Sequence, residues 1–220
     1  HALMGPNGNG KSTLLSAIMG NPKYQVTEGS IYLDGQNVLE MSVDERSKAG
    51  IFLGMQYPQE IPGVVTSDFL RAALNAHQEK PVSLFKFIKE LDKNIADLKM
   101  DENLAHRYLN EGFSGGEKKR NEILQMKLLK PKFALLDEID SGLDVDALKI
   151  VSEAINDMKS DSFGCVMVSH YERLFELVPP SHVHILVDGK IVLSGGQELI
   201  DRIDKEGYRW VKELGFDFET

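Results

Sequence analysis

The chain has little cysteine, no long apolar run and a deficit of positive charge, and each of these excludes a class of protein. Its 220 residues include one cysteine, Cys165, which cannot form an intramolecular disulfide and cannot by itself supply the thiolates of an iron–sulfur cluster. No apolar run approaches the roughly 18 residues of a membrane-spanning helix. The formal net charge of −9 repels phosphate backbones, which argues against non-specific binding of nucleic acid.

What the chain does contain is enough apolar material for one folded unit. With 42% hydrophobic residues, 220 residues can bury a sizeable core, so we expect a single domain over 1–220. Cys165 lies in an apolar, strand-like stretch and is expected to be a buried thiol. The simplest setting is a reducing one, either the cytoplasm or, if a transit peptide precedes this sequence, the stroma of an organelle.

A glycine-rich loop near the start is typical of phosphate binding. Residues 5–13 fit the pattern G-x-x-x-x-G-K-[ST] in full, between an apolar run that predicts a strand and a segment that predicts a helix. Backbone N–H groups of such a loop surround phosphate oxygens, its lysine reaches the β and γ phosphates, and its first hydroxyl ligates Mg²⁺. The candidate ATP-binding residues are Gly5, Asn7, Gly8, Gly10, Lys11, Ser12 and Thr13.

Two carboxylates follow another apolar strand pattern. The run 133–136 leads directly into Asp137 and Glu138. Beside an intact phosphate loop, Asp137 is the expected partner of Mg²⁺, mostly through water. Glu138 is then placed to polarise or deprotonate an attacking water. An ordinary strand end that enters a polar loop is the alternative.

A second glycine loop, Ser114-Gly115-Gly116, precedes a predicted helix over 117–129 and carries three cations in its first turn, Lys118, Lys119 and Arg120. The helix dipole disfavours cations there, so a nearby phosphate or carboxylate is one interpretation and a solvated basic face is another. A further hypothesis is that Lys119 or a neighbour pairs with Glu138 in the resting state.

Periodicity predicts the remaining organisation. Segments 31–38 and 184–193 are expected to be hairpins that turn at Asp-Gly. Residues 66–112 are rich in helix formers and predict a helical subdomain, whereas 56–65 is expected to be a loop. The tail 197–214 predicts amphipathic helix with Tyr208 and Trp210 in packing roles. An apolar stripe in the helical region is assigned to core packing and comprises Leu84, Phe87, Ile88, Leu91, Ile95 and Leu98.

Taken in order, the motifs resemble those of the ATP-binding-cassette (ABC) ATPases. The series comprises the phosphate loop, Gln56 in 54–58, the signature 113–117, the run 133–138, a D-loop at 141–144 and Ser169-His170. The resemblance covers essentially the whole chain. It implies an α/β P-loop NTPase fold, with a mixed sheet core, antiparallel β elements and a helical subdomain at 66–112. It also implies that further strands, and an aromatic residue that stacks on adenine, precede His1.

The same resemblance implies a role for each motif residue. Two subunits dimerise head to tail on ATP, and the signature of one contacts the nucleotide of the other through Ser114, Gly115, Gly116 and Glu117. The D-loop residues Ser141, Gly142, Leu143 and Asp144 communicate across that interface. The implied catalytic residues are Glu138, His170 and Gln56, and the implied metal-binding residues are Ser12, Gln56 and Asp137.

Longer strings around three motifs narrow the resemblance. Residues 57–64, 116–126 and 140–148 are similar to the Suf-type branch of the family, the soluble ATPase subunits of an iron–sulfur cluster assembly machinery. This implies an ATPase that uses ATP and Mg²⁺, docks SufB-like and SufD-like soluble scaffold subunits through 56–65, and neither binds nucleic acid nor inserts in a membrane. The alternatives are the ATPase subunit of a membrane ABC transporter and a module that closes on ATP without turnover.

Overall fold

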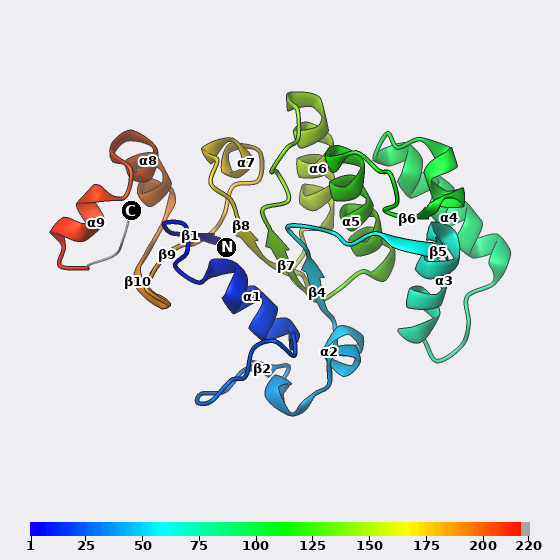
Figure 1. The fold of residues 1–220 in the computed structure, drawn as a ribbon, viewed down its shortest axis with the longest axis horizontal. Coiled ribbons are helices and arrows are strands. Elements are labelled where there is room, and N and C mark those ends of the chain that lie inside the picture. Colours follow the sequence, from blue (N-terminus) through cyan, green and yellow to red (C-terminus); the bar gives the residue numbers. More distant parts are fainter. Residues whose placement is uncertain (217–220) are drawn as a thin grey trace.

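The computed structural model describes residues 1–216, and its centre is a six-stranded sheet (Figure 1). In spatial order the strands are β10 (Lys190–Gly195), β9 (Val183–Val187), β1 (Ala2–Met4), β8 (Gly164–Val168), β7 (Phe133–Asp137) and β4 (Ile51–Gly54). All neighbouring pairs are parallel except β9 and β10. The mixed sheet that the sequence predicts is confirmed, and the parallel strands end at one common edge.

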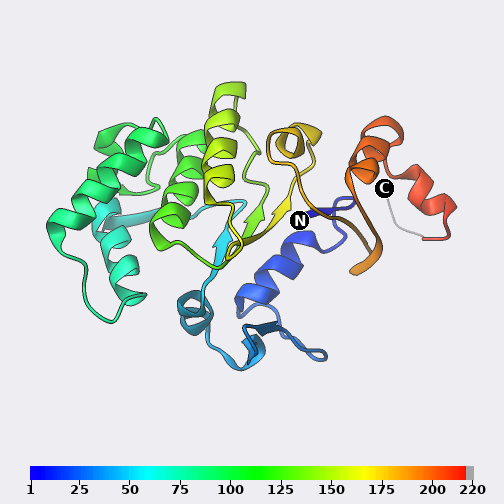
Figure 2. The ribbon, with the colours of Figure 1, turned by 180° about the vertical axis from the view of Figure 1, so that it is seen from behind.

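Helices cover both faces of this sheet, as the views from the front and from behind show (Figures 1 and 2). One face carries α1 (Lys11–Met19) and α2 (Val43–Ala49), and the other carries α5 (Gly115–Leu129), α6 (Val145–Met158) and α7 (Glu172–Leu177). Side chains alternate along β7, so Leu135 packs with Leu15 of α1 whereas Leu136 joins the cluster on the α5 side. Burial on both faces explains why the core strands are continuously apolar.

The two predicted hairpins are confirmed. β2 (Tyr32–Leu33) pairs antiparallel with β3 (Gln36–Asn37), which leads into the short helix η1 (Val38–Glu40). Both turn residues have positive φ, 49° at Asp34 and 79° at Gly35, and the same holds at the turn between β9 and β10. Asp-Gly suits this geometry because glycine carries no Cβ and aspartate tolerates the left-handed region.

A helical lobe lies at one end of the sheet, beyond β4 (Figure 1). It contains α3 (Thr66–Ala76), α4 (Leu84–Asp97) and η2 (Glu102–His106). The expected loop over 56–65 is wrong in part, because β5 (Ile61–Val65) pairs antiparallel with β6 (Tyr108–Leu109). This pairing satisfies backbone groups that a loop would leave to water.

The apolar stripe of the lobe is confirmed at Phe87, Leu91, Ile95 and Leu98, which are buried. It is wrong at Leu84 and Ile88, which are 52% and 45% exposed. At about 100° per residue, Leu84 and Ile88 fall close to the arc that Leu91 and Ile95 occupy, so helix face alone does not explain their exposure. They belong to the first turns of α4, whereas Leu91 and Ile95 lie further along it.

The C-terminal segment forms α8 (Gln197–Glu206) and α9 (Arg209–Glu213) at the other end of the sheet. Trp210 is buried beside Ile185, and the Arg202 guanidinium lies 4.2 Å from its ring centroid, which confirms its packing role. Cys165 is partly rather than fully buried, and burial raises the pKa of its thiol to about 12. Among residues 1–216, no helix combines the length and the apolar composition needed to cross a membrane.

Candidate nucleotide site

Four parallel strands deliver the predicted motifs to the same edge of the sheet. The phosphate loop follows β1, Gln56 follows β4, Glu138 follows β7 and His170 follows β8. Ligands of open α/β sheets bind at the carboxyl ends of the strands, and this is where a cavity of about 370 Å³ opens. Its lining consists of Asn7, Gly8, Gly10, Lys11, Ser12, Thr13, Gln56, Glu138 and His170.

The phosphate loop is preformed around its lysine. Gly8 and Gly10 adopt φ of 77° and 100°, a conformation that glycine reaches without a steric cost. Lys11 is 5% exposed, and its Nζ donates to the carbonyls of Gly5 at 2.7 Å and Pro6 at 2.9 Å. Burial lowers the pKa of Lys11, while the carboxylates of Glu138 and Asp137 oppose that shift. The loop therefore already orients the Lys11 ammonium, and a phosphate group could replace the two carbonyls as its partner.

Residues from the far end of the chain support the loop. The Gly5 N–H donates to the hydroxyl of Tyr208 at 2.9 Å, and the Asp188 N–H donates to Asn9 Oδ1 at 2.7 Å. A Cβ at Gly5 would collide with the carbonyl oxygen of Leu186, so only glycine fits that approach to β9. The packing role expected for Tyr208 thus includes a hydrogen bond that periodicity could not indicate.

Glu138 stands at the centre of the polar cluster. Its Oε2 accepts a hydrogen bond from Gln56 Nε2 at 2.7 Å, and its Oε1 lies 3.0 Å from His170 Nε2. Its backbone has φ of 48°, a conformation that costs energy in a residue with a Cβ and that turns the side chain toward the cavity lined by the phosphate loop. The structure therefore brings together the three residues that the motif series assigns to catalysis.

Asp137, Ser12 and Gln56 could hold a divalent cation. Asp137 is buried, and its Oδ1 has no hydrogen-bond partner among the described residues. Burial raises the pKa of Asp137, and a hydrogen bond from Ser12 opposes that shift. A carboxylate oxygen without a partner, near the Ser12 hydroxyl, suits a hard cation such as Mg²⁺, which prefers oxygen ligands, and Gln56 lines the same cavity as Ser12.

The signature loop lies outside this cavity. Ser114 caps α5 in a reciprocal pair, in which the Glu117 N–H donates to Ser114 Oγ at 3.2 Å and the Ser114 N–H donates to Glu117 Oε2 at 2.7 Å. Ser114 and Gly115 are exposed, and Gly116 faces Leu143 of the D-loop. The signature is thus presented outward and does not contact the phosphate loop of its own subunit.

The cations of α5 do not form a solvated basic face, and the hypothesis of a resting pair between Lys119 and Glu138 is wrong. Lys119 is 4% exposed, and its Nζ donates to the carbonyls of Met55 at 3.2 Å and Gln56 at 2.6 Å. Lys118 pairs with Glu60 at 2.7 Å. Glu138 instead contacts Gln56 and His170. The hydrogen bonds of the Lys119 ammonium thus go to backbone carbonyls and not to the Glu138 carboxylate that the sequence suggested.

The D-loop continues from Glu138 toward α6. Asp144 Oδ1 accepts a hydrogen bond from the Ala147 N–H at 2.7 Å and so caps α6, while Ser141 and Gly142 are exposed. Sequence reasoning missed Asp140, which is buried and accepts a hydrogen bond from Ser169 Oγ, the residue before His170. Its position two residues after Glu138 was the available signal.

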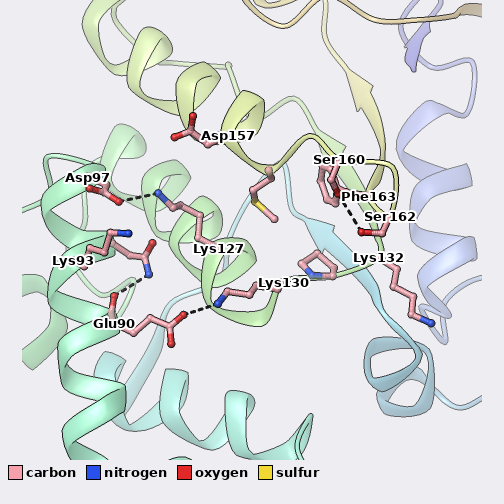
Figure 3. Close-up of a pocket in the computed structure, with 13 residues that line it drawn as sticks. Glu90, Lys93, Asp97, Lys127, Lys130, Lys132, Asp157, Ser160, Ser162 and Phe163 are labelled. Atoms are coloured by element: carbon pink, nitrogen blue, oxygen red, sulfur yellow. Dashed lines mark hydrogen bonds and ion pairs between the residues drawn. The ribbon is translucent and has the colours of Figure 1, made fainter.

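A second cavity, about 650 Å³, lies away from the motifs, between α4, the C-terminal ends of α5 and α6, and the segment 160–163 (Figure 3). It contains several lysines, but Lys127 pairs with Asp97 at 3.3 Å and Lys130 with Glu90 at 2.8 Å. These ion pairs connect α4 to α5 and neutralise the charge of both lysines. The smaller cavity with the phosphate loop therefore remains the candidate site.

Comparison with known proteins supports the same conclusion. The family model described as "ABC transporter" matches residues 1–141. "Vegetative protein 296" of Bacillus subtilis is 61% identical over 100% of this chain and 85% of its own length. A "Probable ABC transporter ATP-binding protein" of Streptococcus pyogenes is 57% identical over 99% and 86%, and a "Probable ATP-dependent transporter" of Synechocystis sp. is 48% identical over 97% and 85%.

Solved structures agree at the level of the fold. A dimeric ATP-binding cassette in a post-hydrolysis state with ADP and phosphate superposes with a TM-score of 0.76 at 22% identity, over 89% of this chain and 84% of that one. The ATP-binding subunit of an ABC transporter gives a TM-score of 0.76 at 24% identity, over 97% and 85%. With the phosphate loop, the carboxylates and the histidine at one sheet edge, these findings show that the chain belongs to the ABC transporter family and is one of its ATP-hydrolysing subunits.

Proposed function

We propose that this ATPase is a SufC-like subunit of the Suf iron–sulfur cluster assembly machinery. The observation that carries the proposal is the set of longer strings around the motifs, 57–64, 116–126 and 140–148, which resemble the Suf-type ATPases. Two of these strings, 57–64 and 116–126, contact each other in the fold. Lys118 pairs with Glu60. In addition, the Asn121 amide donates to Asn110 Oδ1, and the Asn110 amide donates to the carbonyl of Gln59. Nucleotide chemistry requires none of these side chains, so they characterise a branch of the family.

In the proposed reaction, water attacks the γ phosphorus of ATP as the bond to the ADP oxygen breaks. Glu138 accepts the proton of that water. Gln56 and His170 both contact the Glu138 carboxylate and hold that carboxylate in place. Lys11 balances charge on the β and γ phosphates. A Mg²⁺ ion held by Ser12, Gln56 and Asp137 would supply further neutralisation of phosphate charge.

The proposed assembly is a head-to-tail dimer. Ser114, Gly115, Gly116 and Glu117 of one subunit would then contact the nucleotide of the other, and Ser141 to Asp144 would lie along the interface. The outward position of the signature supports this arrangement. We further propose that 66–112 acts as a helical subdomain of one cassette.

The sequence predicts docking through 56–65, but the partner face proposed here lies beside that segment, on a cavity that residues 56–65 do not line. An apolar cavity of about 250 Å³ lies between β4, α2, α3 and α5, and its rim includes Met55 and Val43, which are both exposed. An exposed apolar hollow beside the catalytic glutamine supports docking of SufB-like and SufD-like scaffold subunits there, because a partner seated on it would sense movement of 55–56. In this role the protein works in the cytoplasm, or in an organelle stroma.

The same cavity would serve the second candidate, the ATPase subunit of a membrane transporter, and the names of the relatives as ABC transporter or ATP-dependent transporter proteins favour it. A pull-down with mass spectrometry from the source cell separates the two. Recovery of two related soluble scaffold proteins supports the Suf assignment, whereas recovery of a multi-pass membrane protein overturns it.

A matched pair of variants tests the docking face. Val43 lines the apolar cavity and is 45% exposed, whereas Val26 is 41% exposed and does not line it. We expect Val43→Asp to lose the partner in the pull-down and Val26→Asp to retain it. Equal recovery of the partner by both variants would place the docking face elsewhere.

A further inference from the structure

Two side chains of the signature helix α5 bind the backbone of residues 55–56, one as a hydrogen-bond acceptor and the other as a donor. Glu122 Oε2 accepts a hydrogen bond from the Met55 N–H at 2.9 Å. Lys119, three residues earlier on α5, donates to the carbonyls of Met55 and Gln56. Residues three apart share one face of a helix, so both sets of hydrogen bonds come from the side of α5 that faces the end of β4. Met55 thus has both its N–H and its carbonyl bound by α5.

Glu122 carries a desolvation cost that a purely structural contact would not require. It is buried, and burial raises its pKa to about 7, although the Met55 N–H, the ammonium of Lys119 and the amide of Gln125 favour the charged form. An apolar side chain would fill the same space without the desolvation cost. What an apolar side chain cannot do is accept the hydrogen bond of the Met55 amide.

The held backbone leads directly to the reacting groups. Gln56 follows Met55, and its Nε2 donates to Glu138 Oε2 at 2.7 Å. The same helix begins at Ser114, in the loop that faces away from its own nucleotide cavity. A continuous series of contacts therefore runs from the signature helix through Glu122 and Met55 to Gln56 and the carboxylate of Glu138.

We propose that Glu122 is a positioning residue for ATP hydrolysis, which fixes Gln56 against Glu138 by holding the Met55 amide and so makes the signature helix and the glutamine move as one unit. This rests on the proposed roles of Gln56 and Glu138. Glu122 does not line the nucleotide cavity. It acts through the backbone, and a displacement of about 1 Å at a catalytic group is enough to lower turnover on the order of 100-fold.

The first test is steady-state kinetics of three variants. Glu122→Leu keeps the volume but removes the acceptor, and we expect kcat to fall roughly 10- to 100-fold while the KM for ATP stays unchanged, because the phosphate loop is untouched. Glu122→Gln keeps an acceptor oxygen and should restore most of the turnover. Glu153→Leu, the same change at an exposed position of α6, should match the parent. A Leu variant with parental kcat, or a Gln variant as slow as the Leu variant, overturns the proposal.

The second test asks whether Glu122 acts through Gln56. In a Gln56→Ala background, Glu122→Leu should cost almost nothing more, because the group that it positions is gone. Independent, multiplicative losses would show a merely structural role. If Gln56→Ala and Glu138→Gln both keep parental kcat, it is the proposed catalytic roles that fail.

The third test needs no substitution and so survives a variant that does not fold. In the unmodified chain, hydrogen exchange at the Met55 amide should be slow, like that of amides inside α5, and much slower than at exposed Tyr57. Exchange of Met55 as fast as that of Tyr57 would show that the contact with Glu122 does not persist in solution.

Discussion

The phosphate loop and the signature helix each bury one lysine, and in both places its ammonium donates to two consecutive backbone carbonyls. Lys11 holds Gly5 and Pro6, and Lys119 holds Met55 and Gln56. Burial lowers the pKa of both lysines. Local chemistry alone would not tell them apart.

The difference lies in what surrounds each ammonium. Lys11 lines the 370 Å³ cavity and is the first residue of α1, whose N-terminus favours an anion, so a phosphate can replace its carbonyl partners. Lys119 does not line that cavity and is enclosed by the backbone that it binds. The first lysine is held ready for a ligand, whereas the second connects two segments permanently.

The largest expected effect lies at the carboxylate between these two regions. Glu138→Gln should retain ATP binding and lower hydrolysis roughly 10²- to 10⁴-fold, the usual range for loss of a general base. Phosphate release and ATP affinity measured on the same preparation check this, and ATP should then trap a dimer. Near-parental turnover would assign the base to another residue.

Exchanging each lysine separates a ligand-binding role from a structural one. Lys11→Ala should weaken ATP affinity roughly 10- to 100-fold, because charge-assisted contacts to the phosphates are lost. Lys119→Met should leave affinity intact and lower the free energy of unfolding by roughly 1–3 kcal/mol, since two partly buried carbonyls lose their donor. Calorimetric titration and denaturant melts give both quantities. A similar loss of affinity in both variants would contradict the comparison.

A third variant tests the outward end of the signature helix. Ser114→Arg should keep the ATP affinity of the isolated subunit, because Ser114 does not line its cavity, and should block dimerisation on ATP. Light scattering with and without ATP measures this. Dimerisation equal to that of the parent would exclude a head-to-tail contact through this serine.

The most gradual expected effect is a dependence on pH, and it concerns Glu122 of the signature helix. The pKa of Glu122 is raised to about 7, so between about pH 4.5 and 7 the folded chain binds more protons at this site than the unfolded chain does. Its contribution to the free energy of unfolding therefore falls as pH rises through that window, by roughly 3 kcal/mol at most. Denaturant melts of the parent minus those of Glu122→Gln should show this decline. A difference independent of pH would mean that Glu122 is not buried in solution.

The two regions also differ in how far the sequence predicts them. The phosphate loop follows a fixed spacing with an electrostatic reason for each position, so the place of Lys11 was predictable. The partners of Lys119 are carbonyls, which every residue carries, and no pattern of side chains could identify them. The sequence does place Glu122 three residues from Lys119 on a predicted helix, which puts both on one face. It could not show that this face meets the backbone of Met55, because that depends on where β4 ends in the fold. Similarly, the exposure of Leu84 and Ile88 depends on how much of the length of α4 the core covers, which the periodicity of the stripe does not give.

The hydrogen bond between Gly5 and Tyr208 joins residues that lie far apart along the chain, and within residues 1–216 the partners of β1 are β8 and β9. During synthesis the ribosome produces the phosphate loop well before its neighbouring strands and its tyrosine. Until then β1 lacks the partners that place the loop at the edge of the sheet. A nascent chain therefore carries the nucleotide-binding residues long before it can assemble the site around them.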